Sequence, residues 1–299
     1  MAKAKVSVML SLFCAERFLS EFLENVAEQS NLDELELSIV HNDPTEAERS
    51  ILDQYSKKIR MIRLETHREN LYASWNRALK QSTGDYIACW NVDDLRVGDS
   101  LERMTHTLDS DRLLGWTFGD FVISSSWGLK KGRYIATPEW SQELGTRGAI
   151  GGPFFMFRRN AMEEVGWFDE QFSSGGDFDY TVRLSLQSRG CRTPGLHGYF
   201  LNEGLGLSTS GKLQQIERTV IQLRYGIYET LDWRYVHPAL RFRILHLLQP
   251  DSLWRPVEQL VPHYQQLIDS RKSAAWLVPI HTVLATCRSW LAKKIRHNR

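Results

Sequence analysis

The amino-acid sequence predicts an α/β fold: a mixed, mostly parallel sheet flanked by helices, followed by a helical C-terminal extension. The first half alternates short apolar runs with segments of helical period, which favours parallel strands joined by right-handed crossover helices. Of the 299 residues, 42% are hydrophobic and 24% are charged, so the chain can bury an ample core. Helical segments rich in tryptophan and interrupted by prolines follow residue 210, which predicts domains at 1–210 and 211–299.

Four apolar runs in the first half are short enough to be buried strands. They cover residues 6–13, 35–40, 59–64 and 86–90. The segments between them place apolar residues on one helical face. These residues are Phe18, Leu19, Phe22, Leu23, Val26 and Ala27, then Ala47, Ile51, Leu52 and Tyr55, then Leu71, Trp75, Ala78 and Leu79. The order predicts a βαβαβαβ unit.

The second half predicts further elements in a less regular order. A helix is expected over 99–108, where Asp99 and Glu102 have the spacing of a capping box. Asn160 is the expected cap of a short helix, and another helix is expected to start near Asp177. Strands are predicted at 114–124, 154–158 and 195–201, and a last helix of this region at 212–225.

Polar side chains follow the fourth apolar run directly, at Asn91, Asp93 and Asp94. Ligands of open α/β sheets bind beyond the carboxyl ends of the strands, and acidic oxygens there suit a hard divalent cation that also holds phosphates. Residues 13–16 contain no glycine, so neither a dinucleotide fingerprint nor a P-loop follows the first strand. The sequence favours a metal-diphosphate site, with a plain strand followed by a helix cap as the alternative.

Composition restricts the partners and the compartment. A net charge of +1 gives no overall field that would attract nucleic acid. The four cysteines, Cys14, Cys89, Cys191 and Cys287, show neither metal-knuckle spacing nor a disulfide framework. Because the N-terminus also lacks a cleavable signal pattern, we expect a cytoplasmic protein.

Residues 86–95 resemble the Asp-x-Asp segment of family 2 glycosyltransferases, which share the GT-A fold. That segment usually reads Leu-Asp-Ala-Asp-Asp; this chain has Asn91 in place of the first Asp and keeps Asp93 and Asp94. Residues 6–16 are similar to the family's Val-Ser-Val-Ile-Ile-Pro-Val-Tyr-Asn-x-Glu. In this segment Ser11 replaces Pro, Phe13 replaces Tyr, Cys14 replaces Asn, and Glu16 is retained.

A second block, residues 165–170 and 175–184, resembles the family's Gly-x-Phe-Asp-Glu and Glu-Asp-x-Asp-Leu-x-x-Arg-Leu. Gly176 replaces the usual Glu, while Asp177, Asp179 and Arg183 match. The resemblance assigns the catalytic base to Asp177, for which a plain N-cap is the alternative. Residues two apart on a helix do not share a face, and Asp179 has the spacing of a helical ion pair with Arg183, so we expect a structural role for Asp179.

Residues 41–45 (His-Asn-Asp-Pro-Thr) lie where the family has Asp-Asp-Gly-Ser-Thr, whose second Asp reads the base. Asn42 replaces that Asp and offers both a donor and an acceptor, which leaves the nucleotide open. Asn76 matches a polar position of the family's helix entry, with a solvated helix residue as the alternative. The resemblance implies a nucleotide-sugar site formed by Ser11, Phe13, Glu16, Asn42, Asn70, Asp93 and Asp94. It also implies that Asn91 and Asp93 bind Mg²⁺ or Mn²⁺.

The expected reaction is inverting transfer of a sugar from a nucleotide-diphosphate donor to a hydroxyl of a glycan or lipid-linked acceptor. The acceptor could stack on tryptophans of the irregular region 125–150, which is otherwise an ordinary surface excursion. A nucleotidyltransferase is one alternative, but its glycine- and basic-rich loop after the first strand is missing. A non-catalytic relative that binds a sugar or partner is the other, favoured by the changes at Asn91, Asn42 and Gly176.

The C-terminal end carries a separate expectation. Residues 287–299 contain five basic residues and no acidic ones, beside a helical stripe of Leu284, Cys287, Leu291 and Ile295. A basic amphipathic helix suits peripheral contact with an anionic membrane surface, and packing against the catalytic domain is the alternative. Residues 274–285 are too short and too interrupted to predict a spanning helix.

Overall fold

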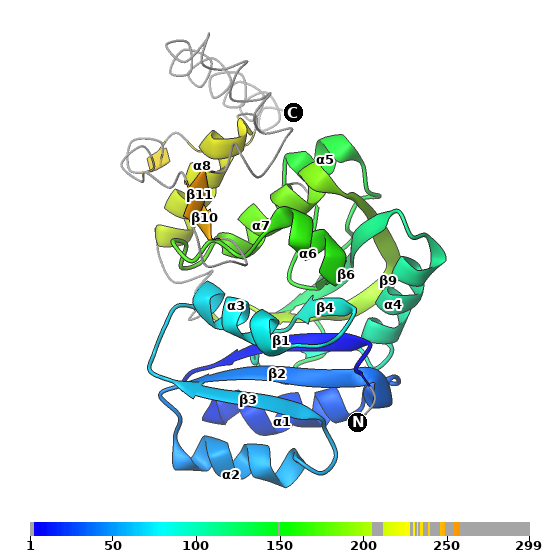
Figure 1. Cartoon of the computed structure of the whole chain (residues 1–299), viewed down its shortest axis with the longest axis vertical. Coiled ribbons are helices and arrows are strands. Elements are labelled where there is room, and N and C mark those ends of the chain that lie inside the picture. Colours follow the sequence, from blue (N-terminus) through cyan, green and yellow to red (C-terminus); the bar gives the residue numbers. More distant parts are fainter. Residues whose placement is uncertain are drawn as a thin grey trace.

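The computed structural model describes residues 3–148, 150–204 and 212–227, and beyond them residues 230, 232, 234–235, 239, 246–248 and 254–256. In this part of the chain a mixed sheet has the strand order β3-β2-β1-β4-β8-β6-β9-β5, with β7 paired to β6 (Figure 1). The strands are β1 Val6–Leu12, β2 Leu35–Asn42, β3 Met61–Thr66, β4 Tyr86–Cys89, β5 Leu95–Arg96, β6 Leu114–Ser124, β7 Arg133–Ile135, β8 Phe155–Arg158 and β9 Arg189–Leu201.

The strand directions decide which ends meet. β1 to β4 are mutually parallel where they pair, β8 is antiparallel to both β4 and β6, and β9 is parallel to β6. β4, β6 and β9 therefore run in one direction although an antiparallel strand separates β4 from β6. The carboxyl ends of β1, β2, β4, β6 and β9 consequently lie at one edge of the sheet.

Helices cover both faces of this sheet. They are α1 Glu16–Ala27, α2 Glu46–Tyr55, α3 Leu71–Gln81, α4 Ser100–Ser110, α5 Gln142–Thr146, α6 Arg159–Val165, α7 Gly176–Gln187 and α8 Leu213–Tyr225, with a 3-10 turn at Leu32–Glu34. Alternate residues of β1 separate two cores: Val8 and Leu10 pack with α1, α2 and α4, whereas Met9 packs with α3, α6, α7 and α8. The predicted α/β architecture is confirmed.

Two predicted helix caps are wrong, and one cap was not foreseen. Asp99 makes no side-chain cap bond because its backbone (φ −106°, ψ 8°) is not extended, and Glu102 instead accepts from Ser30. Asn160 lies inside α6, which follows Arg158, and bonds only its neighbouring amide at Ala161. The capping box forms instead before α2, where Thr45 is extended and pairs with Glu48.

The C-terminal region is only partly helical. Helix α8 agrees with the predicted 212–225, but β10 (His246–Leu248) pairs antiparallel with β11 (Trp254–Pro256), which corrects the expectation of a purely helical extension. The basic stripe and tail at 284–299 lie outside the described residues. Among the helices that are described, none has both the length and the apolar character needed to cross a bilayer.

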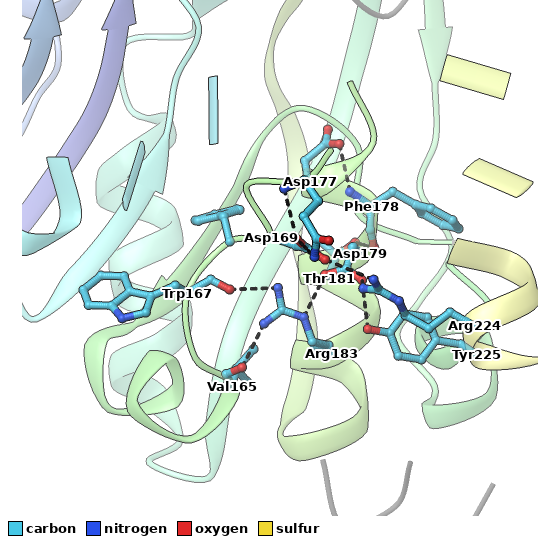
Figure 2. A network of polar contacts seen from close by, with 12 residues as sticks. Val165, Trp167, Asp169, Asp177, Phe178, Asp179, Thr181, Arg183, Arg224 and Tyr225 are labelled. Atoms are coloured by element: carbon cyan, nitrogen blue, oxygen red, sulfur yellow. Dashed lines mark hydrogen bonds and ion pairs between the residues drawn. The ribbon is translucent and has the colours of Figure 1, made fainter. Parts of the chain in front are cut away.

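A buried ion network joins α7 to α8 (Figure 2). Asp179 accepts from Arg183 Nε at 2.8 Å, from Arg224 Nη1 at 2.8 Å and from the Tyr225 hydroxyl at 2.8 Å. Arg224 also donates to Asp169 at 3.0 Å. The predicted Asp179–Arg183 pair is confirmed, and its full burial makes its role structural.

We expect Asp179→Asn to destabilise the fold by about 3–5 kcal/mol, because it leaves two buried arginines short of one counter-charge. Burial alone would raise the pKa of Asp179, but Arg183 and Arg224 outweigh it and lower the pKa below its ordinary value. Its stabilising contribution is therefore complete above about pH 4 and is lost as the pH falls further.

Urea unfolding at neutral and acid pH measures the stability loss of Asp179→Asn and its dependence on pH. Glu65→Gln is the matched control, because it breaks the exposed Arg49–Glu65 pair and should cost no more than about 1 kcal/mol. Equal losses in the two variants would contradict a structural role for the buried network.

Candidate active site

The carboxyl ends of β4, β6 and β9 are joined by hydrogen bonds. The amide of Leu201, the last residue of β9, donates to Asp94 Oδ1 at 3.1 Å. The next amide, Asn202, donates to the carbonyl of Ser124 at the end of β6, at 2.8 Å. The polar segment after β4 is thereby fixed against two other strand ends.

Asp94 helps to hold these strand ends together. It is 2% exposed, and burial, assisted by the charge of Asp93, raises its pKa well above the ordinary value. The Asn91 amide lies 3.4 Å from Asp94 Oδ2, and the Trp90 indole donates to the Asp94 carbonyl at 2.9 Å. The carboxylate is therefore turned toward β9 rather than toward solvent.

Asp93 is the acidic side chain that faces open space. It is only partly buried and lines a small recess together with Ser124, Trp127 and Tyr199. Burial and, secondarily, the negative charge of Glu203 raise the pKa of Asp93. The structure thus places Asp93 and Glu203 at the same edge.

Two residues of this edge were not identified as site residues from the sequence. Arg17, at the start of α1, donates two hydrogen bonds of 2.8 Å to the Glu203 carboxylate. Glu203 also accepts from the Trp127 amide at 3.0 Å. The two residues are 186 positions apart, and no local pattern relates Arg17 to Glu203.

Asp177 occupies the second position of α7, and Gly175 is the cap, so the N-cap alternative is wrong. Its Oδ1 accepts from the Phe178 amide at 2.8 Å and lies 3.4 Å from the Tyr72 hydroxyl. Its carboxylate points away from Asp179 and the ion network (Figure 2). Burial raises the pKa of Asp177. Asp177 is therefore a partly buried carboxylate that lies outside the ion network.

The ends of β1 and β2 present an aromatic ring and a carboxylate. Phe13 is 39% exposed, and the Arg68 guanidinium lies 4.1 Å from its ring centre. The Arg68 amide donates to Asp43 Oδ1 at 3.2 Å. Asp43 has φ 43°, a left-handed conformation that non-glycine residues seldom adopt and that often marks a functional position. These groups form a rim beside the strand ends.

Asn42 is buried beneath this rim rather than exposed on it. It is 1% exposed, and its amide lies within bonding distance of Ser11 Oγ (3.2 Å), the Leu12 carbonyl (3.2 Å) and Ser74 Oγ (3.0 Å). Its carbonyl oxygen accepts from the Glu69 amide at 3.0 Å. Both polar atoms of Asn42 are thus engaged by the protein.

The remaining predicted residues connect loops at the same edge. Glu16 accepts from Thr45 Oγ1 at 2.7 Å. Asn70 caps α3 through the Ala73 amide at 2.8 Å and donates to the Glu170 carbonyl. Asn76 is buried and bonds the backbone of Phe168, so its interpretation as a solvated helix residue is wrong; α3 turns this face toward the loop before α7.

The oxygen donors fit a divalent cation only in part. Asn91 and Asp93 offer an amide and a carboxylate, the hard donors that Mg²⁺ and Mn²⁺ prefer. Within the described ranges no cluster of three His, Cys, Asp or Glu side chains could hold a metal. Magnesium sites commonly combine one or two protein carboxylates with substrate phosphates and water. These residues therefore fit a cation that arrives with a diphosphate.

Comparison with known proteins identifies similar sequences. The model of the family described as glycosyl transferase family 2 matches residues 7–166. EpsE of Bacillus subtilis (strain 168), provisionally named a glycosyltransferase, is 31% identical over 140 residues, or 45% of this chain and 50% of EpsE. The uncharacterized glycosyltransferase MJ1057 of Methanocaldococcus jannaschii is 28% identical over 192 residues, which are 61% of this chain and 65% of MJ1057. The chain thus spans half to two thirds of the length of these curated relatives.

Solved structures share the fold at low identity. TarS of S. aureus, residues 1–349 with UDP-GlcNAc, has a TM-score of 0.63 at 18% identity over 78% of this chain and 69% of that chain. The mannosyltransferase PcManGT of Pyrobaculum calidifontis, in complex with GDP-Man and Mn²⁺, has a TM-score of 0.54 at 16% identity. The match covers 97% of this chain and 81% of PcManGT. The fold is GT-A, as predicted.

We expect Asn42→Asp to destabilise the protein by about 3 kcal/mol without any ligand present. A carboxylate cannot donate to Ser11, Leu12 and Ser74, and it would place a charge in a buried position. Chemical unfolding of the ligand-free variant measures the loss, with Asn160→Asp on the exposed face of α6 as control. An unchanged unfolding midpoint would show that Asn42 is not held as the structure indicates.

Proposed function

Because the chain belongs to glycosyl transferase family 2, we propose that it transfers a sugar from a nucleotide-diphosphate donor to a hydroxyl acceptor with inversion at the anomeric carbon. The observation that carries this proposal is the position of Asp177, a partly buried carboxylate in the first turn of α7 that points away from the ion network. The segment Asn91–Asp94 follows the carboxyl end of β4. The proposed base and the site of the leaving diphosphate would then lie on either side of the donor sugar.

Asp177 is the proposed general base. Its carboxylate accepts the proton of the acceptor hydroxyl while that oxygen attacks the anomeric carbon, and the bond from that carbon to the diphosphate oxygen breaks. Burial raises the pKa of Asp177, which makes it a stronger base than a solvated aspartate. Both bonds to neighbouring residues are made by Oδ1, which supports a role for Oδ2 toward the acceptor.

Asn91 and Asp93 are the proposed ligands of a divalent cation. A bound Mg²⁺ or Mn²⁺ would neutralise the charge that develops on the leaving diphosphate. Glu203 and Arg17 lie at this edge as an ion pair, so the protein also holds a cationic side chain there. The Mn²⁺ in the PcManGT complex supports the choice of metal.

The nucleoside is assigned to the ends of β1 and β2. We assign base stacking to Phe13 and contacts with the base or ribose to Asp43, Ser11, Glu16 and Arg68, beside Asn70. Asn42 would shape the floor of the site, and Asp94 would hold the β4 end in place. The structurally similar proteins were solved in complex with UDP, UDP-GlcNAc and GDP-Man, which supports a nucleotide sugar as the donor class. A glycan or a lipid-linked saccharide is the proposed acceptor.

We expect Asp177→Asn to lower kcat by about 10²–10⁴-fold, the usual contribution of a general base, with nearly unchanged donor affinity. Turnover of labelled nucleotide sugars and binding of the same donors by calorimetry separate the two quantities. Asp179→Asn, assayed below its own unfolding transition, is the control and should keep most of its activity. Full activity of Asp177→Asn would remove this residue from the reaction.

We expect Mn²⁺ to bind measurably only in the presence of a nucleoside diphosphate, because the protein supplies few ligands of its own. Asp93→Ala should weaken that binding by about 10- to 100-fold. Electron paramagnetic resonance of Mn²⁺ with and without UDP or GDP reports binding directly, and Asp99→Ala serves as a surface control. Tight stoichiometric binding to the ligand-free protein would contradict the proposed site.

A further inference from the structure

Tyr72 of α3 fills the space beside the first turn of α7. Its side chain is 1% exposed, stacks on Phe168 with ring centres 6.1 Å apart, and contacts Trp75 edge to face at 5.5 Å. A Cβ atom at Gly176 would lie 2.8 Å from the Tyr72 ring, closer than side chains approach one another. The missing side chain at position 176 is therefore matched by a tyrosine that occupies its place.

The Tyr72 hydroxyl lies at the carboxylate of Asp177, with Oη 3.4 Å from Oδ1. Burial and, secondarily, the charge of Asp177 raise the pKa of Tyr72 well above its ordinary value. A separation of 3.4 Å is long for this kind of bond, but such bonds often shorten when a substrate closes the site. In the described part of the chain, Tyr72 is thus the side chain from outside α7 that bonds to Asp177.

Glu217 of α8 holds the loop that leads into α7. It is 1% exposed; Oε1 accepts from the Ser173 amide at 2.9 Å, and Oε2 accepts from the Ser174 and Gly175 amides at 2.8 Å each. A Cβ atom at Gly175 would lie 3.3 Å from the Cβ of Glu217. One buried carboxylate therefore collects three successive amides immediately before the helix that carries Asp177.

We propose that Tyr72 and Glu217 are positioning residues for Asp177. The Tyr72 hydroxyl orients Oδ1 so that Oδ2 meets the acceptor hydroxyl, and Glu217 fixes the loop from which Asp177 projects. The proposal rests on the proposed role of Asp177 as the base. It assigns α3 and α8 to the catalytic site, although neither supplies a group that touches the reacting atoms.

The two residues act on the base in opposite directions. Burial raises the pKa of Asp177, hydrogen bonding from Tyr72 lowers it, and the charge of Glu217 raises it. Among the described residues, the pKa of Cys89 of β4 is raised by burial and, secondarily, by the charge of Asp177, and Arg218 of α8 lies over the ring of the adjacent Phe178. Removing the tyrosine hydroxyl should therefore raise the pKa of Asp177, and neutralising Glu217 should lower it.

Tyr72→Phe and Glu217→Gln test the proposal in the full chain. Each should reduce kcat by on the order of tenfold with little change in donor KM, because one oriented hydrogen bond is lost. The acid limb of the pH-rate profile should move to higher pH in Tyr72→Phe and to lower pH in Glu217→Gln. NMR titration of the ¹³C-labelled carboxyl groups reports the pKa of Asp177 without relying on turnover.

Matched controls are Tyr55→Phe on α2 and Glu164→Gln on the exposed face of α6. Neither control should change kcat or the pKa of Asp177. Tyr72→Phe keeps the packed ring, so it decides the question even if Glu217→Gln fails to fold. An Asp177 pKa and kcat that stay unchanged in Tyr72→Phe would overturn the inference. Full activity of Asp177→Asn would overturn the proposed base, whereas the proposed function itself would fail if the unaltered protein transferred no sugar from any nucleotide-diphosphate donor.

Discussion

The position of α7, the helix that carries the proposed base, depends on charges buried between α7 and α8. Asp169 and Asp179 are neutralised by Arg183 and Arg224, and none of the four side chains has appreciable contact with water. Arg183 also donates to the carbonyls of Val165 and Trp167, so the same network fixes the loop before α7. Buried ion pairs add little net stability over apolar packing, but losing one partner is costly. The network therefore specifies one arrangement of α7.

Two aspartates on that helix have opposite electrostatic surroundings. Asp179 lies among arginines, and its pKa is lowered, whereas Asp177 has no buried arginine partner among the described residues and burial raises its pKa. Helical geometry directs the two carboxylates to different faces because they are two positions apart. Anchoring and the proposed proton transfer thus fall to two different carboxylates within one turn, and a single charge does not have to serve both.

The sequence predicted what depends on local periodicity. Strands β1 to β4, helices α1 to α3 and the Asp179–Arg183 pair all follow from spacings of a few residues. Arg224, Glu217 and Arg17 could not be found in this way, because their partners are distant along the chain and no pattern links them. Asp99 failed as a cap although its spacing was suitable, since the backbone angle at that residue decided the outcome. Asn42 appeared accessible from its motif, but tertiary burial engages both of its polar atoms.

The junction at the sheet edge also constrains the order in which this protein can fold. The bond between Leu201 and Asp94 spans 107 positions of the chain, and the pair of Arg17 with Glu203 spans 186. Contacts of such separation close large loops and form late, whereas β1 to β4 can pair as soon as they emerge from the ribosome. During synthesis, a nascent chain that ends before β9 would expose the unfinished edge to solvent. The recess beside Asp93 is thus completed only at the end of folding, when the last strand of the sheet is added.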